Sequence, residues 1–434
     1  MPQEFPFYTE QVHLQGPFTN TTGNAARDTK TAFDEGRNKL DVRDYISLLE
    51  PMQSPLVTLL TQPVKVWDGA GWKSLGLNKQ PVIGTYEFKW LEDRYSSRFS
   101  KVSAYAVSGD TTITVSANTT EPAFLFTAGD VVKNIRTGEQ FIVKSVATST
   151  TITVDANGRA FGSTPAAAMV AGDGLVIIGS ANSENATARN VNVTKTKSQS
   201  NITQIFRDTV SASGTFKELD LYGGKGLTYD RTKKMTEHKL SIEYAFIFGE
   251  KKEDVTGSAG ATALSTQGHS LRTTGGVMEL ITGGDSFIQD QAGNPLTAPD
   301  LNNFLGKTQF YGKKKTIMAG TNFLMAVNEI ARGQIRTKVG DDTYGINIST
   351  WMTPFGEVEI IYNPLFGQEY AGHALLLDMN DQNFVYRFIP NRDTFMRMNI
   401  QDPSMDGEVD EILTECGLER HQAPKHSLIY GIGA

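Results

Sequence analysis

Residues 226–248 read GLTYDRTKKMTEHKLSIEYAFIF, and this stretch carries the longest helical pattern in the chain. It has no proline and no internal glycine, and its apolar residues recur near the spacing of one helix face. That apolar set is Leu227, Met235, His238, Ile242, Ala245 and Phe246. The charged residues expected to face elsewhere are Lys233, Lys234, Glu237 and Glu243. Because Gly249 supplies a C-terminal stop, we predict one helix about 33 Å long.

Alternating residues upstream of this helix predict two extended strands. Within residues 85–91, Tyr86, Phe88 and Trp90 alternate with polar neighbours, which is the period of a half-buried strand. The same alternation returns after Arg189, where Val191 and Val193 are separated by Asn192. We therefore expect a two-stranded excursion before the long helix.

An internal repeat lies inside this excursion. Residues 111–118 read TTITVSAN and residues 150–157 read TTITVDAN, while the triplet AGD occurs at 128–130 and again at 171–173. β-Branched runs broken by Gly, Asn and Asp at short intervals are typical of a compact all-β module. We predict such a module over residues 103–183, inserted between the paired strands. It either binds neighbouring molecules or acts as a spacer.

Helical and strand patterns alternate after the long helix. Helices are expected at 300–311 and 322–332, with a buried strand at 316–319 between them and strands on either side of residues 353–356. Such mixing predicts a separate compact α/β subdomain. The remaining strands are expected at 374–378 and 383–389, joined at Asn380-Asp381, and within 411–430, which runs back to the core.

Segments rich in proline or glycine predict the less regular parts. Residues 1–60 hold several prolines and one short helical pattern at 41–49, which indicates an arm laid along another surface; a frayed terminus is the alternative. Residues 257–284 are rich in Gly, Ser and Thr and predict a mobile loop.

Composition narrows the class of protein. The 434 residues suggest about two or three folded units, and 39% hydrophobic residues are enough to form a large core. Lys plus Arg number 41 against 48 Asp plus Glu, and this net charge of −7 argues against a nucleic-acid reader. The one cysteine allows no intrachain disulfide and no thiolate metal cluster. The N-terminus predicts no secretory signal, and no apolar stretch predicts a membrane span.

No motif for phosphate or metal binding is recognised. Residues 223–226 read GGKG and lack the Ser or Thr that follows a P-loop lysine, so they indicate a turn. Asp341-Asp342 and residues 378–381 lack the spacing of a calcium loop, and solvated turns explain these acids better. The histidines form no HExxH pattern; they are His13, His238, His269, His373, His421 and His426.

No nucleophile or nucleic-acid-binding run is recognised either. Cys416 has no basic neighbour in sequence that would lower its pKa, and it is interpreted as a small core or surface residue. The runs Lys251-Lys252 and Lys313-Lys314-Lys315 are expected on solvated faces. The sequence therefore predicts no catalytic, cofactor-binding or metal-binding residues, and no enzyme.

The order of these elements resembles the HK97-type major capsid fold of tailed phages, and more specifically the SU10-like major capsid protein family. Four stretches carry the likeness: residues 203–208 (TQIFRD), the helix from Lys233 to Phe248, residues 344–350 with 353–359 (TPFGEVE), and residues 375–378. The resemblance covers roughly residues 30–60 and 185–430. It does not cover the repeat-bearing insertion.

The resemblance implies an α+β fold with four regions. They are an N-terminal arm (1–60), an extended loop (61–205) carrying the 103–183 module, a peripheral domain with the spine helix (206–255 and 401–434), and an axial domain (256–400). It implies a virion protein that self-assembles into hexamers and pentamers of an icosahedral shell around double-stranded DNA, after synthesis in the host cytoplasm. Further implied partners are a decoration or cement protein, the portal, a scaffold and, non-specifically, the packaged DNA. No membrane and no covalent Lys–Asn crosslink is expected.

A second interpretation stays open at this point. The repeated Thr-rich strands of residues 103–183 also suit an accessory virion or tail protein that binds a receptor, such as a glycan. A hydrolase is a third hypothesis, which rests only on scattered acidic residues.

Overall fold

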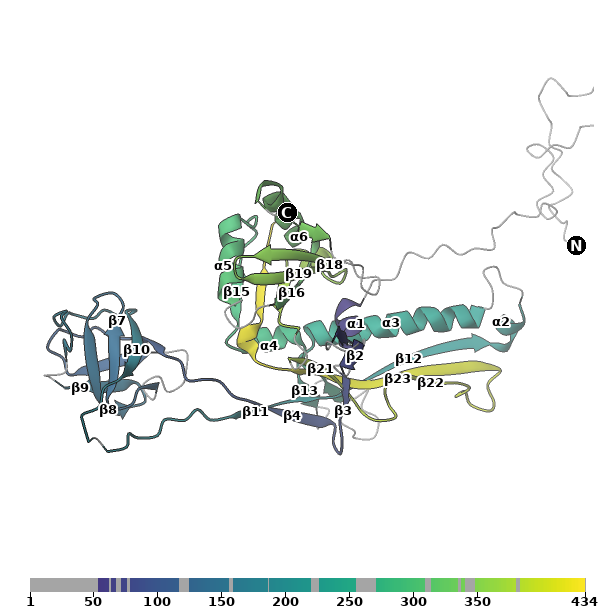
Figure 1. Ribbon diagram of the computed structural model, residues 1–434. Coiled ribbons are helices and arrows are strands. Elements are labelled where there is room, and N and C mark those ends of the chain that lie inside the picture. Colours follow the sequence, from purple (N-terminus) through teal and green to yellow (C-terminus); the bar gives the residue numbers. More distant parts are fainter. Residues whose placement is uncertain are drawn as a thin grey trace, which may run out of the picture.

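A long helix lying on a sheet of extended strands forms the elongated part of the molecule (Figure 1). This computed structural model describes residues 54–61, 64–67, 72–75, 79–116, 125–155, 159–185, 187–219, 226–254, 271–308, 314–334, 337–339, 348–379 and 383–433. The helix expected at 41–49 lies outside these residues. The long helix α3 runs from Gly226 to Phe248, as predicted.

The sheet under α3 has the order β12-β23-β21-β3, and β22 also pairs with β23. Its strands are β12 (Gln204–Ser213), β23 (Gly407–Arg420), β21 (Phe384–Phe388), β3 (Lys79–Pro81) and β22 (Phe395–Arg397). Asp208 of β12 contacts His238 of α3, and Asp410 of β23 contacts Arg231 of α3. Because successive strand residues point to opposite faces, the odd-numbered residues of β12 and β23 point away from α3.

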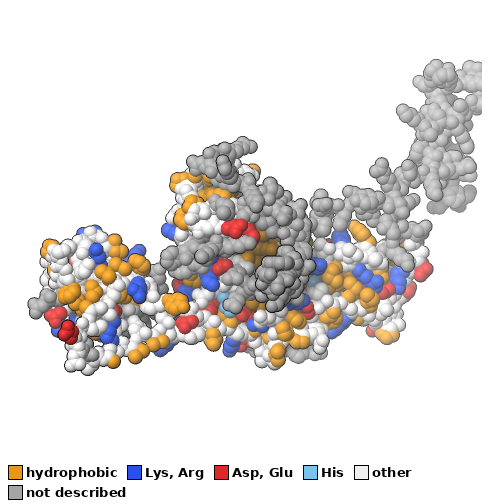
Figure 2. All heavy atoms as spheres, in the orientation of Figure 1, with side chains coloured by type: hydrophobic (Ala, Val, Ile, Leu, Met, Phe, Trp, Pro, Cys, Tyr) orange, Lys and Arg blue, Asp and Glu red, His pale blue; other side chains and the backbone are white. Residues whose placement is uncertain are grey.

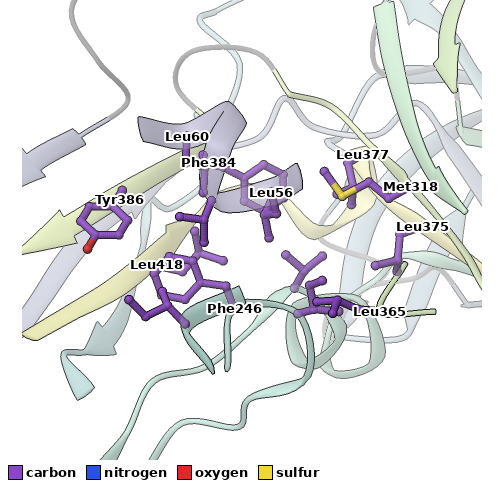
Figure 3. Packing of buried hydrophobic residues seen from close by; sticks show 14 of the residues in the cluster. Leu56, Leu60, Phe246, Met318, Leu365, Leu375, Leu377, Phe384, Tyr386 and Leu418 are labelled. Atoms are coloured by element: carbon purple, nitrogen blue, oxygen red, sulfur yellow. The ribbon is translucent and has the colours of Figure 1, made fainter. Parts of the chain in front are cut away.

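The main core joins this sheet to α3 and to a short helix, α1 (Pro55–Thr61). Leu56 and Leu60 of α1 are fully buried beside Phe246 of α3 and Phe384 of β21 (Figure 3). The end of the region expected to be an arm is therefore part of the folded core.

A second sheet of seven strands forms the α/β part, with the order β15-β24-β20-β16-β19-β18-β17. Its strands are β15 (Phe287–Asp290), β24 (Ser427–Tyr430), β20 (Ala374–Leu377), β16 (Lys314–Ala319), β19 (Gly356–Tyr362), β18 (Ile348–Thr353) and β17 (Thr337–Val339). The helices α5 (Ala298–Thr308) and α6 (Thr321–Gln334) bury Phe304 and Phe323 against it. The predicted alternation of helix and strand is confirmed here.

Strands that are neighbours in sequence separate between the two sheets. β20 and β21, expected as a joined pair, lie in different sheets, and β24 pairs with β15 and β20 rather than with β23. The chain thus crosses between the sheets more often than the predicted division at residue 400 implies. Strand partners are chosen by complementary buried faces, which sequence proximity does not specify.

Two antiparallel strands, β4 (Glu87–Glu92) and β11 (Lys197–Ile202), leave the body and lead to a separate barrel (Figure 1). Phe88 and Trp90 are buried in β4, as the alternation predicts. The strand expected around Val191 is wrong: residues 187–196 form no strand, and no described strand pairs with them. β-Branched alternation gives a strand only where a partner supplies hydrogen bonds and burial.

The barrel is closed in the order β10-β5-β6-β9-β8-β7. Its strands are β5 (Phe99–Val102), β6 (Thr112–Ser116), β7 (Asp130–Asn134), β8 (Gln140–Thr148), β9 (Thr151–Val154) and β10 (Gly174–Ser180). The two repeated strands, β6 and β9, pair with each other, Ile113 opposite Ile152. Exchanging β5 with β8, β6 with β9 and β7 with β10 reproduces the same order, so the barrel is two copies of one three-stranded unit.

The remaining elements are short. They are β1 (Val64–Trp67), β2 (Trp72–Leu75), α2 (Gly214–Glu218), β13 (Lys252–Asp254), β14 (Leu271–Thr273), α4 (Val277–Gly283), and the 3-10 turns Gln368–Tyr370 and Ala423–Lys425.

The loop expected at 257–284 is wrong in its second half. Residues 255–270 lie outside the described part of the chain, but β14 and α4 follow them. Gly276 and Gly284 flank α4 rather than interrupt it, and Val277 and Ile281 are fully buried. Two buried apolar residues one turn apart outweigh the turn signal of the glycines around them.

Candidate functional site

We first located the candidate metal-ligating residues in the described part of the chain. Among the described residues no three His, Cys, Asp or Glu side chains are grouped so that they could hold a metal ion. His13, His269 and Asp341-Asp342 lie outside the described part, as do residues 223–225 of the GGKG stretch. In the part of the chain that the structure describes, no helix is both long and hydrophobic enough to span a membrane.

Cys416 lies in the core between the sheet and α3 and is fully buried. Burial raises the pKa of its thiol to about 12, with Asp393 adding to the rise and the hydrogen bond from Tyr386 opposing it. A thiol held in its neutral form is a poor nucleophile. The structural interpretation of Cys416 as a core residue is thus the correct one.

Lys315 and Asp378 form a buried polar cluster, which corrects two sequence interpretations. Both had been expected on solvated surfaces, yet Lys315 is fully buried, its Nζ donates to the carbonyl of Lys425 at 2.8 Å and lies 3.7 Å from Asp378. Desolvation lowers the pKa of Lys315, and desolvation lowers that of neighbouring His426 to about 3. These groups join β16 to the turn before β24, and their partners are distant in sequence, so no local signal could reveal them.

For Glu243, the position predicted from the helical pattern differs from the observed one. It had been expected to face away from the core, but its side chain is fully buried, and its carboxylate accepts the backbone N–H groups of Leu56 (2.8 Å) and Val57 (2.6 Å). These are the unpaired amides of the first turn of α1, which require an acceptor. Desolvation raises the pKa of Glu243 to about 7, against the lowering effect of the two amides. The carboxylate therefore fastens α1 to the long helix.

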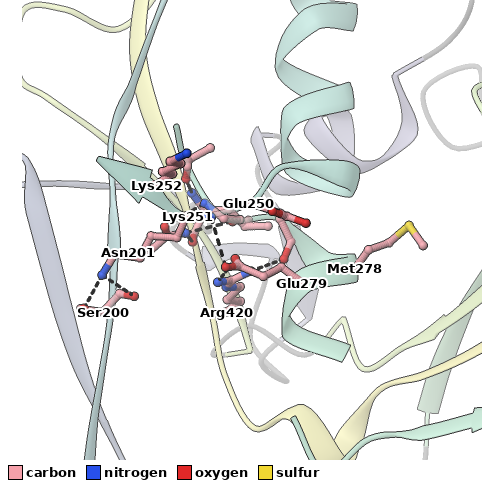
Figure 4. Close-up of polar contacts among 12 residues, drawn as sticks. Ser200, Asn201, Glu250, Lys251, Lys252, Met278, Glu279 and Arg420 are labelled. Atoms are coloured by element: carbon pink, nitrogen blue, oxygen red, sulfur yellow. Dashed lines mark hydrogen bonds and ion pairs between the residues drawn. The ribbon is translucent and has the colours of Figure 1, made fainter. Parts of the chain in front are cut away.

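A polar junction holds the base of the two-stranded excursion to the body (Figure 4). The fully buried amide of Asn201 donates to the carbonyls of Gly275 and Leu418, and it accepts the N–H of Gly275 at 2.9 Å. Beside it, Arg420 donates to Glu279, whose other oxygen accepts the N–H of Lys251 at 3.1 Å. One cluster thus joins β11, the end of α3, the start of α4 and β23.

The surface of the excursion has a different character. Tyr95 is completely exposed, and Val191, Val193 and Leu91 are 87%, 72% and 71% exposed. Ile83, just before β4, is 85% exposed. Single exposed apolar residues are ordinary, but here several lie along the two chain segments that connect the body to the barrel. Such segments are suited to contact with another molecule.

The described residues present several hydrophobic cores and, between the body and the barrel, exposed apolar side chains. Figure 2 shows hydrophobic side chains distributed over both the barrel and the elongated part of the molecule. This arrangement is suited to association with other molecules through exposed apolar side chains.

A family model and several solved structures match this chain. The family model for the SU10 major capsid protein matches residues 18–433. Among solved structures, the cyanophage A-1(L) capsid is similar at 12% identity and a TM-score of 0.45, covering 92% of this chain and 98% of that one. The capsid of Myoviridae phage XM1 is similar at 9% identity and a TM-score of 0.42, covering 93% and 100%. The holo-SrpI encapsulin complex of Synechococcus elongatus has 9% identity and a TM-score of 0.39, covering 55% and 78%. The search of curated proteins finds no match.

Proposed function

Because the chain belongs to the SU10 major capsid protein family, whose model matches residues 18–433, we propose how this major capsid protein of a tailed phage builds its shell. Copies associate as hexamers and pentamers, which close into an icosahedral shell around double-stranded DNA. In this proposal the protein assembles the shell and catalyses no reaction. Further partners in the proposal are a decoration or cement protein, the portal, a scaffold and, non-specifically, the packaged DNA.

The observation that carries this proposal is the exposed apolar surface of the excursion. Tyr95, Val191 and Val193 are left in solvent by the isolated subunit, although each offers apolar area that favours burial. A neighbouring copy supplies that burial if the excursion lies over it. Interfaces of about 2,000 Å² or more per copy then make the closed shell hard to disassemble.

The proposal assigns each region of the chain a role in the shell. The N-terminal arm, expected at residues 1–60, is the part before α1 and clasps a neighbour, while α1 anchors it in its own subunit. Residues 61–205 are the extended loop. The barrel is an inserted domain on that loop; its strands run from Phe99 to Ser180, close to the 103–183 expected from the repeat. The peripheral domain is built on α3 and the β12–β23 sheet, and the axial domain on the seven-stranded sheet. The family match spans body and barrel together, which favours the shell over a separate receptor-binding protein.

Electron microscopy of the purified full-length protein tests assembly. We expect icosahedral shells or ring-shaped capsomers. A protein that stays strictly monomeric at high concentration would contradict the proposal.

The contact surface is tested by replacing Tyr95 and Val191 with Ser. Both side chains are exposed in the subunit, so its free energy of unfolding should stay within about 0.5 kcal/mol of the parent. Shell yield should fall, because the apolar area that a neighbour would cover is gone. Exchanging Thr228 and Thr232, exposed polar residues of α3, for Ala gives a control. If the Tyr95 and Val191 variant forms shells in normal yield, the excursion is not part of the interface between copies.

Removing residues 1–40 tests the arm. The subunit should remain folded, because α1 and its buried leucines are retained. Assembly or particle stability should decrease, as measured by the yield of intact particles after heating. Particles of unchanged yield and stability would refute the clasp.

A further inference from the structure

Four arginines cover two buried carboxylates on the face of the β12–β23 sheet that points away from α3. Arg207 and Arg397 both contact Glu411, with Nε of Arg207 at 2.5 Å and Nη1 of Arg397 at 3.7 Å. Arg272 and Arg392 both contact Glu415, at 3.1 and 2.5 Å. We call this group of four arginines and two glutamates the arginine face.

The arginine face carries more positive charge than its own carboxylates can neutralise. Four guanidinium groups stand against Glu411 and Glu415, and Glu253 lies opposite Arg272 in the β13–β14 register, so 4 minus 3 leaves a surplus of one positive charge. The glutamate side chains are only about 5% exposed, whereas those of Arg207, Arg397 and Arg392 are 60%, 47% and 35% exposed. The outward edges of these guanidinium groups keep donors free to bind a further anion, because each group has five N–H donors.

Apolar side chains accompany the arginines. Ile205, which lies opposite Glu415 in the register, is 41% exposed, and the guanidinium of Arg397 lies over the ring of Phe395 at 5.3 Å. No lysine occurs in β12, β22 or β23. Exposed arginine with aromatic and aliphatic neighbours, and without lysine, is the composition of a protein interface; a phosphate backbone has no use for the apolar residues. The fitting partner is an acidic protein segment.

The chain itself contains such a segment. Residues 1–53, outside the described part, hold eight Asp or Glu and five Lys or Arg, so 5 minus 8 gives a net charge of −3, and they include Phe5, Phe7 and Tyr8. Fully extended, they would span on the order of 170 Å. They join the fold at α1, which packs against α3. Since the arginine face points away from α3, the arm of a neighbouring copy can reach it without passing around the subunit's own sheet.

We propose that the arginine face is the docking surface for the acidic N-terminal arm of a second copy. This inference rests on the proposed clasp role of the arm and adds where the arm binds. Docking places acidic side chains against the outward guanidinium groups and covers Ile205.

A photo-crosslinking amino acid placed at Ile205 of the full-length protein tests the proposal, because this position leaves every ion pair of the face intact. Particles are assembled from an equal mixture of isotopically heavy and light protein, irradiated and analysed by mass spectrometry. We expect crosslinks to peptides of residues 1–53 that join heavy to light chains. Crosslinks to other segments, to another protein, to nucleic acid, only within one chain, or none at all in well-formed particles would overturn it. Absence of particles from the parent protein would count against the proposed function instead.

Two double variants that remove the same amount of charge test whether the positive charge of the arginine face contributes to binding of the arm. Arg392→Gln with Arg397→Gln removes two of the four positive charges, yet Glu415 keeps Arg272 and Glu411 keeps Arg207, so no buried carboxylate loses its last partner. We expect the yield of crosslinks to the arm to fall several-fold. Lys233→Gln with Lys239→Gln removes the same charge from exposed positions of α3 and should leave the yield unchanged. Equal yields in the two double variants would rule out the arginine face as the docking surface.

Discussion

At the scale of single residues, buried polar side chains connect distant parts of the chain by hydrogen bonds. Glu243 binds two amides of α1, and Asn201 binds Gly275 and Leu418. Each is satisfied by hydrogen bonds that a buried polar group requires. Such groups favour one arrangement of the elements because every alternative leaves them unpaired.

Glu243 predicts a pH dependence of stability. Its pKa is about 7 in the fold and near 4.5 in the unfolded chain, so between these values the unfolded chain has lost a proton that the folded chain keeps. The stabilising effect is complete below pH 4.5, and the free energy of unfolding decreases by about 3 kcal/mol as pH rises to 7. Urea unfolding at pH 5, 6 and 7.5 measures this slope.

Glu243→Gln should flatten that slope, because the amide does not ionise. At pH 5 it should also cost about 1–3 kcal/mol, because one of the two α1 amides loses its acceptor. Glu237→Gln, at an exposed position of the same helix, is the control and should keep the parental slope. A parental slope in Glu243→Gln would assign the effect to other groups.

Cys416 predicts slow thiol chemistry. The pKa of the buried thiol is raised to about 12, so the thiolate is scarce at pH 8 and the sulfur is covered. We expect no reaction with a thiol reagent over hours in buffer and stoichiometric reaction in denaturant. Rapid labelling of the native protein would show that the sheet opens from α3.

At the scale of elements, the barrel shows how a repeated sequence builds a closed structure. The AGD triplets make equivalent turns: Asp130 accepts the N–H of Thr127 at 2.7 Å, and Asp173 accepts that of Val170 at 3.0 Å. Their glycines, Gly129 and Gly172, both have positive φ, which glycine adopts without steric cost. Two copies of one unit pair through β6 with β9 and β7 with β10, so no strand edge is left open.

The buried pair Arg159 and Glu139 should control the stability of the barrel. Arg159 donates two bonds to Glu139, at 2.9 and 3.0 Å, and both side chains are almost fully buried. Arg159→Met leaves a buried charge without its partner and should destabilise the barrel by about 3–5 kcal/mol. Hydrogen exchange of the β6 and β9 amides, followed by mass spectrometry, measures the change.

Adding Glu139→Gln to Arg159→Met provides the control. Removing the unpaired charge should restore part of the loss in amide protection. If the double variant is as unprotected as the single variant, lost packing rather than the buried charge explains the effect.

At the scale of the whole molecule, the barrel is attached to the body through two chain segments that meet at its base. The N–H of Ile177, within the last barrel strand β10, donates to the carbonyl of Arg98, just before the first barrel strand β5, at 2.9 Å, so the first and last barrel strands lie side by side. The barrel also has its own core, centred on Phe141, Ile113 and Ile152. A body without the barrel therefore needs only a short connection.

Replacing residues 99–176 with a Gly-Asn turn should leave the body folded, because none of the main core is removed. We expect parental hydrogen-exchange protection in α3 and weaker particles, measured by their yield after heating. An insoluble body would show that the barrel is required for folding.

The local sequence pattern was sufficient to predict an element whose own residues determine its structure. The pattern of residues 226–248 predicts α3 with its observed ends, and Phe88 and Trp90 of β4 are buried as alternation requires. The local sequence pattern was insufficient where contacts with a distant part of the chain decide whether a segment forms a strand or a side chain is buried. Val191 and Val193 alternate equally well but have no described strand beside them, and Glu243 is buried because α1 supplies donors from 187 residues away.

The sequence alone determined the long helix, the duplicated β unit, the alternating α/β region and the family to which the chain belongs. Only the tertiary structure decided which strands share a sheet, which charges are buried, and where four arginines gather over two glutamates. The physical reason is that periodicity and turn chemistry act between near neighbours along the chain, whereas burial and charge pairing depend on groups that folding brings together.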